Sequence, residues 1–190
     1  NKSLIIHNPV EEYSIAQNVL HMLRSDNQFT ELEAEVLDLI LVIHAEHGGG
    51  NNSTFTSHVV SSTRTDTYSS ISASIGALKG PMHGGANSMV TKMVEDIKKN
   101  TNPYDEVKLK EYLKKIFNKE VFDKKGRIYG MGHAVYTISD PRAVLLKKKA
   151  YELAKEKNAL EEFELFSNIE KLTKEIGKET KGKNFEICAN

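Results

Sequence analysis

Apolar residues recur at spacings of three and four along most of the chain, and this pattern constrains the fold more than any other feature. It is found near residues 10–24, 31–47, 88–97, 109–117, 141–157 and 159–178. Alternation with the period of a strand is nearly absent, and only residues 126–136, GRIYGMGHAVY, suit a strand or an extended loop. The sequence therefore predicts an all-α, multi-helical fold.

The segment 31–47 has signals for both the start and the end of a helix. Thr30 and Glu33 form a capping-box pattern at its start, and a run of three glycines follows its end. Between them, apolar residues lie on every side of the helix. Such a helix is expected to be buried all round, at the centre of a multi-helix body.

Composition excludes several classes of partner. The 190 residues suit one domain or two small ones. The 26 basic and 26 acidic residues cancel, so we expect no nucleic-acid or membrane partner. Cys188 is the single cysteine, which is typical of a reducing compartment, and we expect a cytoplasmic protein. No apolar run approaches the roughly 20 residues that span a bilayer, and no signal peptide is visible.

Two histidines, His44 and His47, lie one turn apart in HAEHGGGNNS. A zinc-binding HExxH motif needs histidines four apart and Glu after the first, whereas here they are three apart and Ala45 follows, so no metal is expected. Interaction with the helix dipole would explain one histidine. It does not explain the three glycines and two asparagines after His47, which leave the helix end open and lined with donors.

A third histidine, His83, stands in KGPMHGGANSM, just before an amphipathic stretch. Unpaired amides of that helix start are expected near it, and they disfavour the charged imidazole. A neutral imidazole can donate a hydrogen bond to a developing oxyanion. The alternative is a histidine that only caps a turn.

Two further stretches add a glycine-rich backbone and a cation. Gly130 and Gly132 allow close backbone approach before His133, although the third glycine of a dinucleotide motif is missing. Arg142, in DPR, lies at a predicted helix start, where a cation opposes the macrodipole unless an anion joins it. A substrate carboxylate or a salt bridge to a protein acid would satisfy it. Histidines, an arginine and open backbone together suit an anionic substrate with a carbonyl to polarise, by general acid–base and enolate chemistry.

Three motifs, HAEHGGGNNST, LKGPMHGGAN and YGMGHAVY followed by DPRA, closely resemble the signature segments of citrate synthases, in the family's order. The resemblance covers most of the chain. It implies an enzyme of the tricarboxylic acid cycle, an acyltransferase that condenses acetyl-CoA with oxaloacetate and hydrolyses citryl-CoA. It implies no metal and no cofactor, since coenzyme A is substrate and product.

The resemblance also implies roles for single residues. His83 matches the histidine that hydrogen-bonds the thioester carbonyl as the enol or enolate forms, and His133 the one that polarises the oxaloacetate ketone. His47 and Arg142 match residues that grip oxaloacetate carboxylates. Coenzyme A is expected at the backbone of Ile128, Tyr129, Gly130, Met131 and Gly132, with Lys181 and Lys183 near its phosphates by a looser alignment.

The sequence departs from the family pattern at both ends. The family's aspartate base lies in a segment resembling NVD, and Asn190 looks like the asparagine of that segment. We therefore expect a fragment, incomplete at both ends and nearly inactive alone. Residues 1–85 would belong to the large domain and 86–190 to the small domain, with a hinge for domain closure near Gly84-Gly85.

Other readings stay open at this point. Propionyl-CoA chemistry, giving 2-methylcitrate, shares the same site residues. A non-catalytic module that binds coenzyme A or a partner protein is the rival from another class. Small residues dominate 54–78, and the helix around 66–78 resembles part of the family's dimer interface, so a homodimer is expected.

Overall fold

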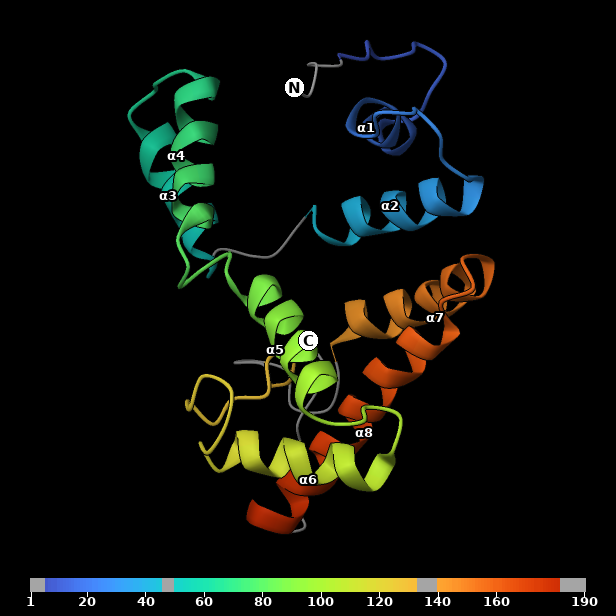
Figure 1. Cartoon of the computed structure of the whole chain (residues 1–190). Helices are drawn as coiled ribbons and strands as arrows, with labels where there is room; N and C mark the ends of the chain where they lie inside the picture. Colours follow the sequence, from blue (N-terminus) through green and yellow to red (C-terminus); the bar gives the residue numbers. More distant parts are fainter. Residues whose placement is uncertain (1–5, 46–49, 133–139, 182–190) are drawn as a thin grey trace, which may run out of the picture. The chain divides into compact units, whose positions relative to one another are not determined.

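The structure is a computed structural model that describes residues 6–45, 50–132 and 140–181. These residues form eight helices and no strand, which confirms the all-α prediction (Figure 1). Contacts divide the chain into two compact units, Asn1–Glu46 with Pro141–Phe163, and His47–Asp140 with Glu164–Asn190. The predicted boundary between residues 85 and 86 concerns the domains of the whole protein and stays a prediction.

The first unit contains α1 (Ile15–Leu23), α2 (Glu31–Ile43) and α7 (Pro141–Glu156), and α2 packs against both of the others. Helix α1 begins five residues later than its apolar pattern does, since Ser14 and Gln17 form a capping box there. Helix α7 begins directly after Asp140, which is buried. Helix α8 (Leu160–Lys181) starts in this unit and continues in the second.

Glu33 joins three parts of the first unit. The predicted capping box with Thr30 is confirmed, and the Glu33 carboxylate also accepts two hydrogen bonds of 2.9 Å from Arg24. Lys157, just after α7, lies 3.1 Å from it. The hydrogen bonds from Arg24 outweigh burial and lower the pKa of Glu33 to about 2.

The expectation that α2 is buried on all sides is wrong for this chain. Ala34 is its buried residue, and Val42 near its end is 64% exposed. An apolar sequence does not tell how many neighbours a helix has, and here α1 and α7 cover part of its surface. The helix ends at Ile43, and the ring of His44 lies 2.8 Å from the Ile40 carbonyl oxygen. This histidine is thus explained as part of a helix end.

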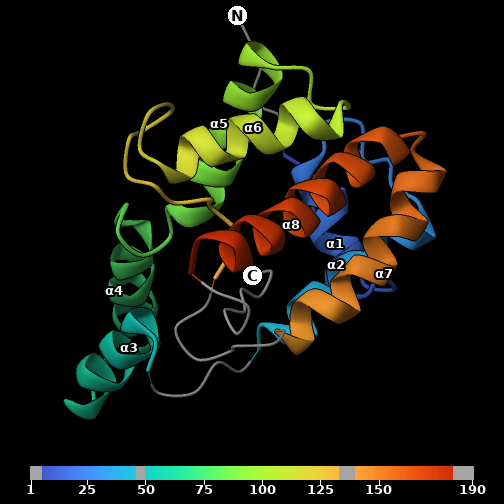
Figure 2. The same ribbon diagram turned by 90° about the horizontal axis from the view of Figure 1, so that it is seen from below.

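In the second unit, α3 (Asn52–Ser62) and α4 (Thr67–Lys79) form a hairpin, and they lie side by side in both views (Figures 1 and 2). The small-residue stretch 54–78 thus holds two helices. They separate at Arg64, which has a left-handed backbone with φ 61°, and Asp66 then caps α4.

The core of the second unit lies between α5 (Ala86–Asn100), α6 (Glu106–Phe117) and the later turns of α8. Each buried aliphatic side chain there contributes roughly 1.5–3 kcal/mol by leaving water. The buried residues are Met93, Val94, Ile97, Leu109, Tyr112, Leu113, Ile116, Ile128, Leu165, Ile169, Leu172 and Ile176. Ile128 anchors the glycine-rich loop that follows α6, so this core positions the loop. Among the described helices, none is long and apolar enough to cross a membrane.

Candidate functional site

His83 lies in a turn, Pro81 to Gly85, that joins α4 to α5. Its backbone N–H donates to the Gly80 carbonyl oxygen over 3.0 Å. A Cβ added at Gly84 would lie 2.3 Å from the Leu78 carbonyl oxygen. A Cβ added at Gly85 would lie 2.4 Å from the Pro81 carbonyl oxygen. The Gly-Gly pair is therefore required by close backbone packing, and this packing holds the turn that carries His83.

The His83 ring is half-buried, and its Nε2 lies 2.8 Å from the hydroxyl oxygen of Ser53. Ser53 stands in the first turn of α3, where the side chain of the N-cap Asn51 accepts its backbone N–H over 2.8 Å. A hydroxyl can donate to an unprotonated ring nitrogen. When Ser53 donates to Nε2, the neutral ring carries its proton on Nδ1 and can donate from there.

Ser53 was not singled out by sequence reasoning. The signal was the polar pair Asn51-Asn52 after the glycine run, since asparagine there is typical of a helix N-cap and puts the next residues in the first turn. Nothing in the sequence shows that a hydroxyl in this turn meets a histidine 30 residues later.

The glycine-rich loop after α6 lines a pocket of about 460 Å³. All five backbone positions predicted to hold coenzyme A, Ile128 to Gly132, lie along it. Gly130 and Gly132 have φ angles of 82° and 90°, which residues with a side chain rarely adopt. The remaining lining residues are Ala86, Phe117, Gly126, Arg127 and Thr173.

Ala86 brings the start of α5 to this pocket. The N-cap is Gly85, and no side chain caps the first turn of this helix. This agrees with the expectation of uncapped amides just after His83, and such amides favour an anionic group. His83 itself is not among the residues that line the pocket.

The other site predictions are placed only in part. Arg142 is half-buried in the first turn of α7, in the first compact unit. His47, His133 and Lys183 lie outside the described residues, as does the side chain of Lys181 at the end of α8. The structure therefore places the loop Ile128 to Gly132 beside the start of α5. It also places His83 beside Ser53, outside the residues that line this pocket.

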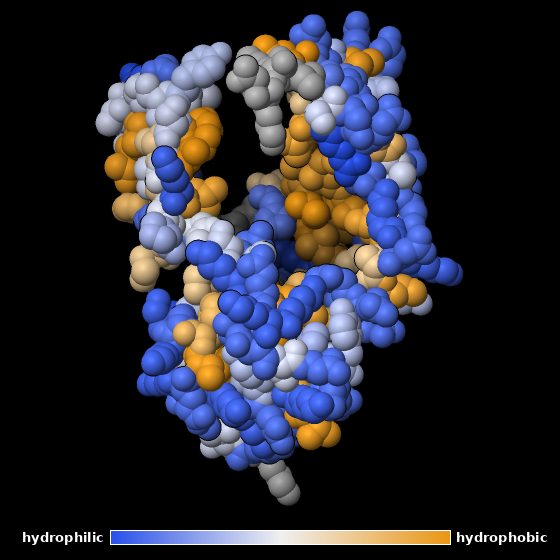
Figure 3. All heavy atoms as spheres, viewed as in Figure 1, coloured by the Kyte–Doolittle hydropathy of each residue, from blue (hydrophilic) through white to orange (hydrophobic). Residues whose placement is uncertain are grey.

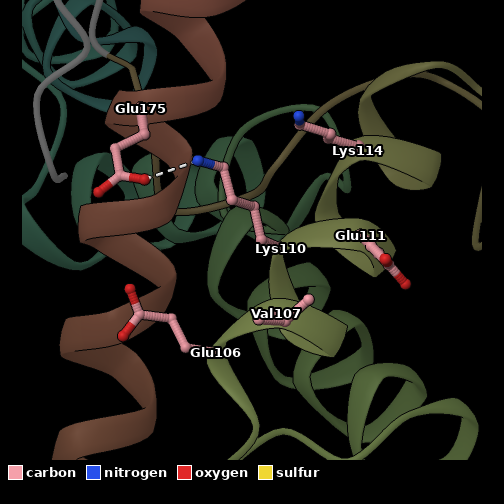
Figure 4. A pocket seen from close by; sticks show the side chains of 6 residues that line it. All are labelled: Glu106, Val107, Lys110, Glu111, Lys114 and Glu175. Atoms are coloured by element: carbon pink, nitrogen blue, oxygen red, sulfur yellow. Dashed lines mark hydrogen bonds and ion pairs between the residues drawn. The ribbon is translucent and has the colours of Figure 1, made fainter.

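A second pocket, of about 550 Å³, lies between α6 and α8 and is lined by charged side chains (Figure 4). Lys110 contacts Glu175 at 2.8 Å and Glu179 at 2.9 Å, and Lys114 contacts Glu179 at 2.7 Å. These lysines are already paired with carboxylates from α8. The pocket is thus an ion-paired helix interface and offers no free charge of this kind to a ligand.

No three His, Cys, Asp or Glu side chains of the described residues form a group that could hold a metal ion. The described part does hold a hydrogen-bonded histidine, a serine hydroxyl, backbone amides without a side-chain cap and an exposed arginine, Arg127.

The sequence and the fold of this chain match those of known proteins. The family model for the citrate synthase C-terminal domain matches residues 1–190. Citrate synthase 2 of Bacillus subtilis is 42% identical over 147 residues, which are 76% of this chain and 36% of that protein. The 2-methylcitrate synthase of Shewanella oneidensis is 34% identical over 149 residues, 78% of this chain and 36% of that protein.

A solved structure shows the same fold. It is the ternary complex of carboxymethyl coenzyme A and oxaloacetate with citrate synthase from the archaeon Thermoplasma acidophilum. The TM-score is 0.67 at 29% identity, over 96% of this chain and 44% of that one. The chain thus spans between 36% and 44% of the length of these three proteins. From the motifs, the fold and these matches, the chain belongs to the citrate synthase family.

Proposed function

We propose that the protein containing this chain condenses acetyl-CoA with oxaloacetate and hydrolyses the product to citrate and coenzyme A. The acetyl methyl group loses a proton, and its carbon attacks the oxaloacetate ketone to form citryl-CoA. Water then cleaves the thioester, so that acetyl-CoA, oxaloacetate and water give citrate and the free thiol. The Thermoplasma complex with carboxymethyl coenzyme A and oxaloacetate supports this choice of substrates.

The observation that carries the proposal is the hydrogen bond of 2.8 Å between Ser53 and Nε2 of His83. We infer that His83 donates from its other ring nitrogen to the thioester carbonyl oxygen. The developing enolate charge would be stabilised there, which is the task of an oxyanion-hole donor. The tight Gly84-Gly85 turn supports this role, since catalysis needs the donor held in one position.

For oxaloacetate, we propose that His47 and Arg142 bind its carboxylates and that His133 polarises its ketone. An arginine holds a carboxylate through two parallel hydrogen bonds, which orients the substrate as well as binding it. These three assignments rest on the match of His47, His133 and Arg142 to the family's motifs.

For coenzyme A, we propose that the loop Ile128 to Gly132 holds the adenine end, with Lys181 and Lys183 near the phosphates. The pocket along this loop and the uncapped start of α5 support the assignment. Coenzyme A is then a substrate and product, and we expect that no separate cofactor is needed.

We also propose that the protein is a homodimer through the α3–α4 hairpin. Orange, apolar spheres gather on this hairpin at the upper left of Figure 3. Exposed apolar residues gathered on one element mark an interaction surface. The large exposed hydrophobic residues of the hairpin are Phe55, Val59, Tyr68, Ile71, Ile75 and Leu78.

The test is thiol release by the whole protein from acetyl-CoA or propionyl-CoA with oxaloacetate. Faster turnover of acetyl-CoA supports the proposal, whereas a preference for propionyl-CoA would make the protein a 2-methylcitrate synthase with the same residue roles. No thiol release from either would favour a non-catalytic module that binds coenzyme A or a partner. The 190-residue chain alone should be a poor catalyst, because none of its aspartates matches the family's base.

A further inference from the structure

Tyr129 occupies a specific place in the loop that we assign to coenzyme A. It lines the pocket between Ile128, which is buried in the core of the second unit, and Gly130. Its hydroxyl donates to Asp123 Oδ2 over 2.5 Å. A hydrogen bond to a carboxylate is shorter and stronger than one between neutral groups. The bond therefore ties the loop to the preceding turn at one point.

Asp123 is itself held by the turn that it belongs to. Its Oδ1 accepts the backbone N–H of Lys125 over 3.0 Å, so both carboxylate oxygens are used. Burial disfavours its charge, yet the hydrogen bond from Tyr129 and the nearby cations Lys125 and Arg127 lower the pKa of Asp123. The same hydrogen bond, together with burial, raises the pKa of Tyr129. At neutral pH the pair is thus a phenol donating to a carboxylate.

The turn around Asp123 needs such support. Phe122 and Lys124 have left-handed backbones, with φ angles of 58° and 56°, which is uncommon for residues with a side chain. The rings of Phe122 and Tyr129 pack in a T-shaped arrangement, with ring centres 6.1 Å apart and an angle of 84° between the planes. The tyrosine therefore holds this turn by its ring as well as its hydroxyl.

We propose that the Asp123–Tyr129 hydrogen bond is a clasp that positions the coenzyme A loop for binding. The inference rests on the function proposed above and adds two positioning residues to it. The clasp would hold the loop in its binding conformation before coenzyme A binds, so that less conformational entropy is lost on binding. Its loss should weaken binding of coenzyme A and leave the condensation step itself nearly unchanged.

The test uses the whole protein with Tyr129→Phe, which removes the hydroxyl and keeps the ring, and Asp123→Asn. Tyr104→Phe is the matched control, since Tyr104 is exposed and lies outside this loop. Removing one such hydrogen bond should raise the KM for acetyl-CoA and the Kd for coenzyme A by about five- to tenfold. The kcat and the KM for oxaloacetate should change by less than about twofold in either variant. The double variant should be no worse than the single ones, because each change already removes the charge-assisted hydrogen bond between the phenol and a carboxylate.

Calorimetry with coenzyme A alone separates this inference from the proposed function. If the wild type binds coenzyme A but releases no thiol, condensation is excluded, and the Kd of Tyr129→Phe still decides whether the clasp acts. An unchanged Kd and KM in both variants would overturn the clasp, as would an equal loss of kcat and of oxaloacetate affinity, which indicates a general structural defect. If the wild type binds no coenzyme A, both the function and the clasp are wrong.

Discussion

The hydroxyl of Ser53 in α3 lies 2.8 Å from Nε2 of His83 in the turn after α4, and this contact fixes the orientation of the imidazole. Because Nε2 is held by a hydrogen bond, the ring stays in one rotamer and Nδ1 is free to donate to a substrate. Ser53 at the start of the helical hairpin and His83 just after it thus meet at the same end of the hairpin and form one proposed hydrogen-bond donor.

Ser53→Ala tests this cooperation. Loss of the hydrogen bond frees the ring and its tautomer, and we expect kcat of the whole protein to fall about tenfold with small changes in KM. Ser62→Ala is the matched control, because the Ser62 hydroxyl donates to the Val59 carbonyl within the same helix. Equal kcat in both variants, by steady-state thiol release, would show that Ser53 does not support His83.

The turn that carries His83 should not accept a side chain at Gly85. Gly85→Ala would place a Cβ 2.4 Å from the Pro81 carbonyl oxygen, so the turn must shift. We expect a loss of about 1–3 kcal/mol in stability and a fall in kcat of about 10- to 100-fold. Gly80→Ala, with its nearest contact at 3.5 Å, should behave like the wild type. Thermal melts and thiol release measure the two effects, and a Gly85 variant as active as the Gly80 variant would contradict the account.

Glu33 should make the free energy of unfolding depend on pH in the acidic range. Its pKa of about 2 lies below its ordinary value of 4.5, so its contribution is present above pH 4.5 and is lost as the pH falls towards 2. Because Arg24 is partly exposed and solvent screens the pair, we expect about 1–2 kcal/mol rather than the full shift. Glu33→Gln should lose this amount at pH 7, in urea unfolding followed by circular dichroism. Glu31→Gln, exposed in the same turn, should not. A Glu33→Gln variant as stable as the wild type at pH 7 would refute the assignment.

The dimer proposal predicts that a charge on α4 prevents assembly. Ile75 is 59% exposed on the hairpin, and Ile75→Glu should shift the whole protein from dimer to monomer in analytical ultracentrifugation. Val107→Glu, at an apolar residue of α6 that is 68% exposed, should leave the dimer intact. If the Ile75→Glu variant remains a dimer, the interface does not lie on the α3–α4 hairpin.

Local patterns predicted the helices well. The capping box at Thr30 and Glu33 marked the start of α2, and the helical spacing of Leu109, Tyr112, Leu113 and Ile116 marked the buried face of α6. Both features depend on residues within one or two turns of each other. The described part of the glycine loop is not helical, as predicted, but it forms a turn, in which the Met131 N–H donates to the Ile128 carbonyl oxygen, and is not extended there.

Features that depend on distant residues were not readable. In α8, Leu165 is fully buried, whereas its neighbour Phe166 is 43% exposed. Which of two adjacent apolar residues faces the core depends on what packs against the helix. Contacts such as Tyr129 with Asp123 need the fold of the loop between them, and a pair such as Ser53 with His83 needs the hairpin.

The most direct test of the account is thiol release from acetyl-CoA with oxaloacetate by the whole protein and its His83→Ala variant. We expect rapid turnover by the wild type and a fall in kcat of about 100-fold or more in the variant, with coenzyme A still bound. A His83→Ala enzyme that retains the wild-type kcat would contradict the role of His83 and, with it, the central claim about this site.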